Sequence, residues 1–401
     1  MASVLAYALN QLGRPADSTS VCRTALQLQS QARGDKAAVF VCLHHAWAQL
    51  SDGTLERAQE QVALARELAR RQCHSLSYEM LSVDILSAQL HHETGQHHQA
   101  LALLDTVLPH IATINGWHHL LASAFSVAAH CASHLHGLEA ARRVLQAGRA
   151  QADDRQWPRL SLAMDITWLA LLIDAGQLQA GRDLLASPGL SALLDDPSPD
   201  LHHQWLQIPA LLASARLQLE LGRPRLALDA LERVRPLPLM ASQQTFRLQA
   251  LLLEMRAQQA LRRIGAANAL LRCALELGLQ TGLVYRLHCQ ARHLRDVRAN
   301  ASHVTSLPLA HRHFLDALPE SNGAKDNERL GGVRIAGNCM LSPREAQTIT
   351  LMAEGCTTKE IARRLGISEG TVKTHRKKIH EKLGVSSRSQ ALTRARELLI
   401  L

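Results

Sequence analysis

Basic and hydroxyl side chains gather near the end of the 401-residue chain, in the segment TVKTHRKKIH. Lys373, Thr374 and Lys377 fall within about one helical turn, so a helix here would present all three on one side. Lysine donates hydrogen bonds to guanine O6 and N7, and threonine offers a hydroxyl or a methyl group to a base edge. The three residues therefore predict contacts to base edges in a major groove.

Four helix-start signals delimit the elements that must position these residues. Residues 342–345, 357–360 and 387–390 each combine a hydroxyl N-cap with a Glu or Gln three positions later, and Ser368 is a further N-cap. Residues 366–368 form the tight turn that a helix-turn-helix requires. We predict four helices, over residues 343–354, 358–365, 369–383 and 387–399.

The third of these helices is predicted to have an apolar face opposite its basic one. On a wheel of about 100° per residue, Val372, Ile379 and Leu383 point the same way. We expect them to pack on a core that contains Ile349, Met352, Ile361 and Leu365. The basic face is then the one that would enter a groove of DNA.

The positive charge of the chain is concentrated in the same region. From position 341 to the end, 12 Lys or Arg residues stand against 6 Asp or Glu, a net charge of +6 out of +9 for the whole chain. A basic domain of this size is typical of a nucleic-acid reader. Double-stranded DNA is the predicted partner.

The segment from Leu341 to Leu392 is very similar to the DNA-binding domain of the LuxR family. L-S-x-R-E, A-x-G, K-E-I-A, L-x-I-S, T-V-K-T-H and I-x-x-K-L-G-V match in order and spacing. The resemblance implies base contacts from the three residues above, and phosphate contacts from Thr358, Lys359 and Arg388 near helix starts. Arg376 departs from the small apolar residue common in the family, and we expect its long side chain to reach a phosphate.

A repeat of 39 to 46 residues fills the chain before this domain. Seven glycines each separate two apolar, helix-like segments, and a small residue follows six of them four or five positions later. Each unit is predicted to be a helical hairpin with a left-handed glycine turn, and stacked hairpins form a solenoid with a concave surface. The glycines are Gly13, Gly53, Gly95, Gly137, Gly176, Gly222 and Gly265, and the small residues are Ala58, Ala100, Ala141, Ala180, Ala227 and Ala269.

The predicted fold is therefore all-α, with a tetratricopeptide-like solenoid of helical hairpins over residues 1–298, a linker over 299–340 and a four-helix helix-turn-helix domain over 341–401. Residues 186–201 and 235–240 are expected to be loops between hairpins. The array resembles that of MalT-type regulators, which implies an effector or partner bound to the repeats. The ATPase of many such regulators is not expected, because no G-x-x-x-x-G-K-[ST] run occurs and Met1 already lies in the first repeat helix.

Several classes of protein are disfavoured by the sequence. The N-terminus lacks the features of a signal peptide and no run of about 18 apolar residues occurs, so we expect a cytoplasmic protein without a membrane partner. The eight scattered cysteines indicate reduced thiols rather than disulfides. No catalytic constellation is present, so neither an enzyme nor a cofactor is predicted.

Two features of the repeats carry alternative interpretations. The pairs His91-His92 and His97-His98 could bind a metal, but adjacent histidines on a helix point in different directions and no cysteine or carboxylate completes a ligand set, so solvated turn residues and no metal are predicted. The five tryptophans could line an effector groove, although packing between helices is their commoner role. They are Trp47, Trp117, Trp157, Trp168 and Trp205.

Two functions remain open at this point. The first is a sequence-specific bacterial transcription regulator that acts as a homodimer on paired half-sites. The second is an interaction scaffold, in which the repeats bind a protein and the basic domain tethers it to DNA of any sequence. A regulator would prefer its operator by about 10³-fold or more, whereas a scaffold would not.

Overall fold

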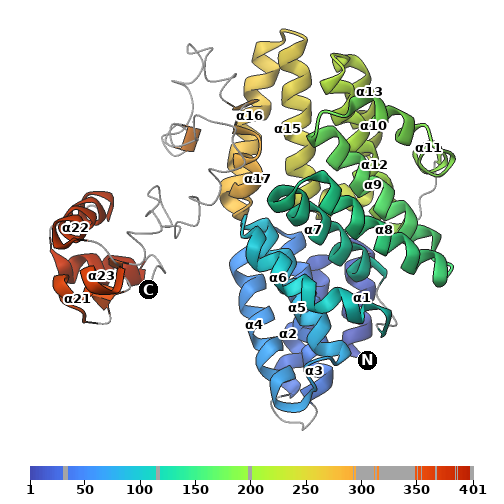
Figure 1. Cartoon of the computed structure of the whole chain (residues 1–401). Helices are drawn as coiled ribbons and strands as arrows, with labels where there is room; N and C mark the ends of the chain where they lie inside the picture. Colours follow the sequence, from blue (N-terminus) through green and yellow to red (C-terminus); the bar gives the residue numbers. More distant parts are fainter. Residues whose placement is uncertain are drawn as a thin grey trace. The chain divides into compact units, whose positions relative to one another are not determined.

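The computed structural model contains two compact units, Met1–Val297 and Arg298–Leu401 (Figure 1). All regular elements in the described residues are helices, which confirms the predicted all-α class. The predicted linker lies outside the described residues except at three positions, and the capping signal at 342–345 lies outside them entirely. The structure describes residues 1–29, 35–113, 118–196, 201–291, 293–294, 311, 314–315, 348–349, 351–353, 355–365, 368–383, 385 and 387–397.

Helical hairpins follow one another through the first unit. In each, two successive helices pack on one another across a tight turn. The hairpin repeat expected from the glycine spacing is therefore observed. The pairs in the described part of this unit are α1 (Ala2–Gln11) with α2 (Pro15–Gln29), α3 (Asp35–Ser51) with α4 (Leu55–Gln72), α5 (Tyr78–Glu93) with α6 (His97–Val107), α7 (His118–His136) with α8 (Leu138–Asp154), α9 (Pro158–Asp174) with α10 (Leu178–Leu185), α12 (Leu201–Glu220) with α13 (Pro224–Val234), and α15 (Gln244–Ala260) with α16 (Ile264–Thr281).

Left-handed residues end the first helix of the hairpins. Six of the seven predicted turn glycines have φ between +64° and +87°. The prediction for Gly265 is wrong, because this residue lies inside α16 and the left-handed residue of that turn is Arg262, with φ of +58°. A pattern that searches for glycine cannot detect a turn in which another residue takes this conformation.

Small buried residues allow the two helices of a hairpin to approach closely. The predicted Ala58, Ala100, Ala141 and Ala227 are fully buried. Ala180 and Ala269 are exposed, however, and the buried small residues of those hairpins are Gly181 and Ala267. Each lies five positions after the left-handed residue of its own turn, so the spacing from the turn decides which side chain faces the partner helix.

Two short helices occupy segments predicted as loops. They are α11 (Pro188–Asp195) and α14 (Pro238–Ser242), and each begins with a proline at its first turn. Proline at that position loses no hydrogen bond and its φ is already helical. The loop predictions are therefore wrong for these residues, because the prolines begin helices as well as end them.

The last helices of the unit contact the turns of early hairpins. Gly53 lies against Thr281 at the end of α16, and Gly95 lies against Tyr285 of α17 (Val284–His288). A Cβ atom added to Gly53 or Gly95 would lie only 2.5 Å from Thr281 Cβ or 2.6 Å from Tyr285 Cδ2. The last helices of the array therefore contact its early hairpins, so the array closes on itself. The periodicity did not predict this closure.

The second unit contains α21 (Thr358–Leu365), α22 (Glu369–Leu383) and α23 (Arg388–Glu397). Residues 348–349 and 351–353 are also helical and belong to the predicted first helix of this domain. The bounds predicted for the second and third helices agree with the structure, and the fourth begins one residue later than predicted. Among the helices of the described residues, none combines the length and hydropathy needed to cross a bilayer.

Candidate functional site

The first helix of the helix-turn-helix, α21, begins with a reciprocal capping box. The Thr357 N–H donates to Glu360 Oε2 at 2.7 Å, and the Glu360 N–H donates to Thr357 Oγ1 at 3.3 Å. The Thr357 hydroxyl also donates to Glu360 Oε2, at 2.9 Å, and the bonds from the Thr357 backbone and hydroxyl lower the pKa of Glu360. An ionised carboxylate therefore lies at this helix start.

The second helix, α22, begins at the predicted cap. Ser368 Oγ accepts a hydrogen bond from the Thr371 N–H at 3.1 Å. Ser387 acts in the same way before α23, where its Oγ accepts from the Gln390 N–H at 3.2 Å. These caps fix where each helix starts, and thus which side chains of α22 face outward.

The core beneath α22 contains the residues that the wheel placed there. Val372 and Ile379 are completely buried. Val372 packs in a cluster with Met352 and Ile361. Ile349 is also buried, whereas the side chains of Leu365 and Leu383 lie outside the described set. The apolar face of α22 is therefore held against the domain.

The opposite face of α22 carries the three predicted base-contacting residues. Lys373, Thr374 and Lys377 are all exposed. The Thr374 hydroxyl donates to the Gly370 carbonyl at 3.1 Å, which fixes its rotamer. Two lysines one turn apart thus present ammonium groups on the side of the helix away from the core.

Three of the four predicted phosphate-contacting residues lie close together. Arg376 is half-buried, and its Nη1 donates to Thr358 Oγ1 at 3.2 Å, which joins α22 to the start of α21. Its Nε is buried and has no hydrogen-bond partner in the described part of the chain. Lys359 is exposed next to Thr358. The guanidinium of Arg376 thus reaches the start of α21, where Thr358 and Lys359 lie.

Arg388 has a structural contact that the sequence did not reveal. Its Nη2 donates to the carbonyl oxygens of Met352 and Cys356, at 2.9 and 3.1 Å. The helix before α21 ends there, with Gly355 at φ +86° and hydrogen bonds from Gly355 N–H to Met352 O and from Cys356 N–H to Leu351 O. A cation at a helix C-terminus satisfies exposed carbonyls and the helix dipole. The phosphate contact of Arg388 stays a prediction.

The histidine pairs of the repeat unit are not placed as predicted. His97 is buried, and Cys131 of α7 lies beside it and His92. The expectation of solvated turn residues is therefore wrong for His97, and so is the statement that no cysteine is near. Cys131 is far along the sequence from the turn, and the packing of α7 on the α5–α6 hairpin brings it close.

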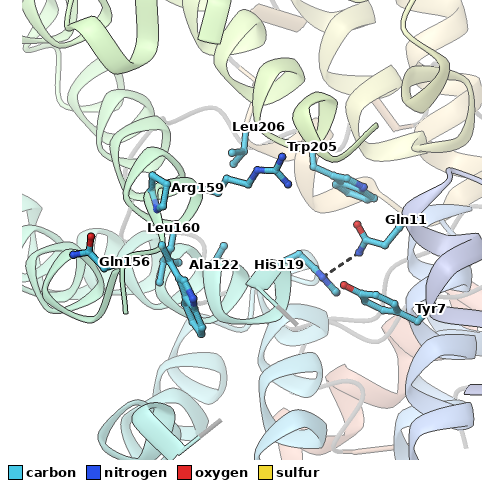
Figure 2. Close-up of a pocket in the computed structure, with 11 residues that line it drawn as sticks. Tyr7, Gln11, His119, Ala122, Gln156, Arg159, Leu160, Trp205 and Leu206 are labelled. Carbon is cyan, nitrogen blue, oxygen red and sulfur yellow. Dashed lines mark hydrogen bonds between the residues drawn. The ribbon is translucent and has the colours of Figure 1, made fainter. Parts of the chain in front are cut away.

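A cavity of about 390 Å³ lies inside the repeat unit (Figure 2). Its walls come from α1, α7, α9, α12 and the turn before α9. Gln11 Nε2 and His119 Nδ1 are hydrogen-bonded across it at 3.1 Å. The lining residues are Tyr7, Gln11, His119, Ala122, Gln156, Trp157, Pro158, Arg159, Leu160, Trp205 and Leu206. The sequence did not identify this set, because it is drawn from hairpins more than 100 residues apart.

Four of the five tryptophans lie in the described residues, and they contribute to the cavity, to the packing of helices or to both. Trp157 and Trp205 line the cavity and also pack against hydrophobic cores. Trp47 stacks on the cavity residue His119, with ring centroids 4.0 Å apart, and Trp168 packs against a hydrophobic core. Trp117 lies outside the described residues. The role of these tryptophans in an effector groove stays a prediction.

Two successive capped helices, the second with an exposed basic face, are the arrangement of a helix-turn-helix DNA-binding domain, and a helical-repeat unit precedes them in this chain. Residues 339–395 match the family described as bacterial regulatory proteins, luxR family. This segment is therefore a DNA-binding domain of the luxR type.

Known transcription regulators resemble the chain over parts of its length. Transcriptional activator protein CarR of Pectobacterium carotovorum is 34% identical over 110 residues, which is 27% of this chain and 41% of CarR. Transcriptional regulatory protein DesR of Bacillus subtilis is 46% identical over 57 residues, 14% of this chain and 29% of DesR. Transcriptional regulatory protein MctR of Rhizobium johnstonii is 41% identical over 61 residues, 15% of this chain and 28% of MctR. The chain thus covers less than two thirds of each relative.

Proposed function

We propose that the chain is a sequence-specific transcription regulator that reads its operator with the exposed face of α22. The observation that carries this proposal is the division of α22 between buried Val372 and Ile379 on one side and exposed Lys373 and Lys377 on the other. Such a helix can lie in a major groove with its lysines toward guanine O6 and N7. Thr374 would add a hydroxyl or methyl contact.

In this proposal a second set of residues holds the DNA backbone. Thr358, Lys359 and Arg376 gather where the start of α21 meets α22, and we assign them to one phosphate. Such contacts fix the orientation of a reading helix without contributing sequence preference. We further propose that the chain acts as a homodimer on paired half-sites.

The repeat unit would act as the sensor. We propose the tetratricopeptide-like, MalT-like architecture for residues 1–298, a linker over 299–340 and the reader over 341–401. The cavity supports this assignment, because aromatic walls with a few polar groups are typical of small-molecule sites. A small molecule with a flat apolar part is the expected effector. Ala122→Phe would fill the cavity and should abolish the thermal stabilisation that such a molecule produces.

The test of the reading face compares specific with nonspecific DNA affinity. Fragments selected from the host genome by the purified protein give the operator, and Lys373→Ala and Lys377→Ala are then measured on it at one salt concentration. Each variant should lose roughly 1 to 3 kcal/mol on the operator and much less on random DNA. The matched control is Arg363→Ala, since Arg363 is an exposed basic residue on α21 and so lies outside the reading helix α22.

Two results would count against this assignment. Equal losses on both kinds of DNA would make the two lysines phosphate contacts and move the reading face elsewhere. Binding to all DNA sequences with similar affinity would favour the interaction scaffold, in which the repeats bind a protein and the basic domain only tethers it.

A further inference from the structure

Two histidines and one cysteine meet where the third hairpin of the array, α5–α6, packs on α7. His92 lies near the end of α5, His97 begins α6, and Cys131 comes from α7. Cys131 Sγ lies 3.8 Å from His92 Nδ1 and 3.5 Å from His97 Nδ1. The ligand atoms of all three residues lie within 4.8 Å of one another. Three different helices thus direct one donor atom each at a common point.

These distances match those required by a tetrahedral ion. With a zinc–sulfur bond of about 2.3 Å and a zinc–nitrogen bond of about 2.0 to 2.1 Å, sulfur and nitrogen ligands of a tetrahedral site lie about 3.6 Å apart. The two observed sulfur–nitrogen distances lie on either side of that value. An ion could therefore enter with only small movements of these side chains.

We propose that His92, His97 and Cys131 bind a transition-metal ion of the Zn²⁺ class. Imidazole and thiolate are the ligands that such ions prefer, whereas Mg²⁺ and Ca²⁺ take oxygen donors. His134 lies three residues after Cys131 on α7, and its ring centroid is 4.3 Å from that of His97. His134 is one further imidazole for the fourth position, and His130, whose ring centroid is 5.8 Å from that of His92, is another. The proposal goes beyond the proposed function, because binding of the ion requires no DNA.

The surroundings of the three residues suit a bound cation. His97 Nε2 lies 2.5 Å from the Tyr285 hydroxyl, so with the ion on Nδ1 the Nε2–H donates to Tyr285 Oη. Metal-binding histidines commonly have such a partner on the second ring nitrogen, which fixes the orientation of the ring. The charge of Arg286 is neutralised by Glu93, which accepts hydrogen bonds of 2.5 and 2.7 Å from it. The guanidinium of Arg286 is thus paired with a carboxylate rather than left to repel the ion.

The protonation states add a measurable consequence. A metal ion binds the thiolate form of cysteine, whereas an ordinary cysteine thiol is protonated at pH 7. The thiol must lose its proton when sulfur binds the ion, and that proton passes to the buffer. Binding should therefore release one proton for each ion bound.

The test uses the full-length protein, reduced and freed of metal by dialysis against a chelator. Co²⁺ is the probe, because a thiolate ligand gives it a charge-transfer absorption band in the near ultraviolet. The wild-type protein should develop this band at one equivalent, and one equivalent of Zn²⁺ should remove it. Cys131→Ala and His97→Gln should show no band. His98→Gln is the matched control in the same turn, since His98 is exposed, and it should behave like the wild type.

A measurement on the unaltered protein covers the case in which the variants do not fold. Calorimetric titration with Zn²⁺ in two buffers of different ionisation enthalpy should give one ion and one proton per chain. Absence of the band together with no saturable Zn²⁺ binding in the wild type overturns the proposal, and the cluster is then only a buried hydrogen-bonded group. Loss of the band in His98→Gln as well would place the ion elsewhere and would equally overturn it.

Discussion

Replacement of Arg388 by alanine should unfold the DNA-reading unit rather than remove a phosphate contact. The side chain donates from Nη2 to Met352 O and Cys356 O, which end the first helix of the domain. A hydrogen bond from a charged donor contributes about 1.5 to 3 kcal/mol. Because Arg388 is only half-buried and water can partly replace it, we expect Arg388→Ala to cost about 2 to 4 kcal/mol in all. A domain of about 60 residues has little more stability than that.

Hydrogen exchange followed by mass spectrometry on the full chain measures this effect directly. Peptides from α21 and α22 should lose most of their protection in Arg388→Ala, whereas peptides from the repeat unit should not change. Arg388→Lys keeps one charged donor, so protection of its α21 and α22 peptides should lie between that of the wild type and that of Arg388→Ala. The reasoning is refuted if protection in α21 and α22 is unchanged while the salt dependence of DNA binding weakens by about one unit, because Arg388 would then be a phosphate contact.

Three further results are expected. Lys359→Ala should leave protection unchanged but flatten the log–log salt dependence of DNA affinity by about one unit, and an unchanged slope would remove Lys359 from the phosphate-binding set. Gly53→Ala and Gly176→Ala should each lose about 1 to 2 kcal/mol in urea denaturation followed by tryptophan fluorescence, because alanine disfavours their positive φ. Gly53→Ala should lose about 1 to 3 kcal/mol more, because only its new methyl group meets Thr281, and equal losses would argue against closure of the array. Burial lowers the pKa of His44 to about 3, against 6.5 in the unfolded chain, so the unfolded state binds more protons and stability falls as the pH drops below 6.5. By pH 5 this should cost about 2 kcal/mol, and His44→Gln should show a smaller decrease.

The sequence predicted best the features that depend on neighbouring residues. A capping box needs only a hydroxyl and a carboxylate three positions apart, and the hydrogen bonds between Thr357 and Glu360 are those that the pattern requires. The two faces of α22 follow from helical geometry in the same way. The turn at Arg262 shows the limit of this reasoning, since a left-handed residue without glycine leaves no mark in a local pattern.

Contacts between distant parts of the chain could not be predicted in this way. The cavity depends on Gln11 and His119, which are 108 positions apart, and closure of the array includes the ion pair of Glu93 with Arg286 at a separation of 193. Each hairpin adds a small rotation to the array, and the sum of these rotations decides whether its ends meet. No single repeat carries that information.

The histidine–cysteine cluster is a long-range contact that the sequence could have predicted in part, because the repeat register relates equivalent positions of α5 and α7. Gly95 and Gly137 mark equivalent turns, so position 92 of α5 corresponds to position 134 of α7, three residues before each glycine. Cys131 lies about one helical turn earlier, and thus on the same face of α7. In a solenoid the equivalent faces of successive hairpins pack on one another, so the ligands for a histidine at a turn should be sought one repeat away as well as within the same turn. By that rule the absence of a cysteine near the HHETGQHH segment is not an argument against a metal site, and Cys131 becomes the first residue to test.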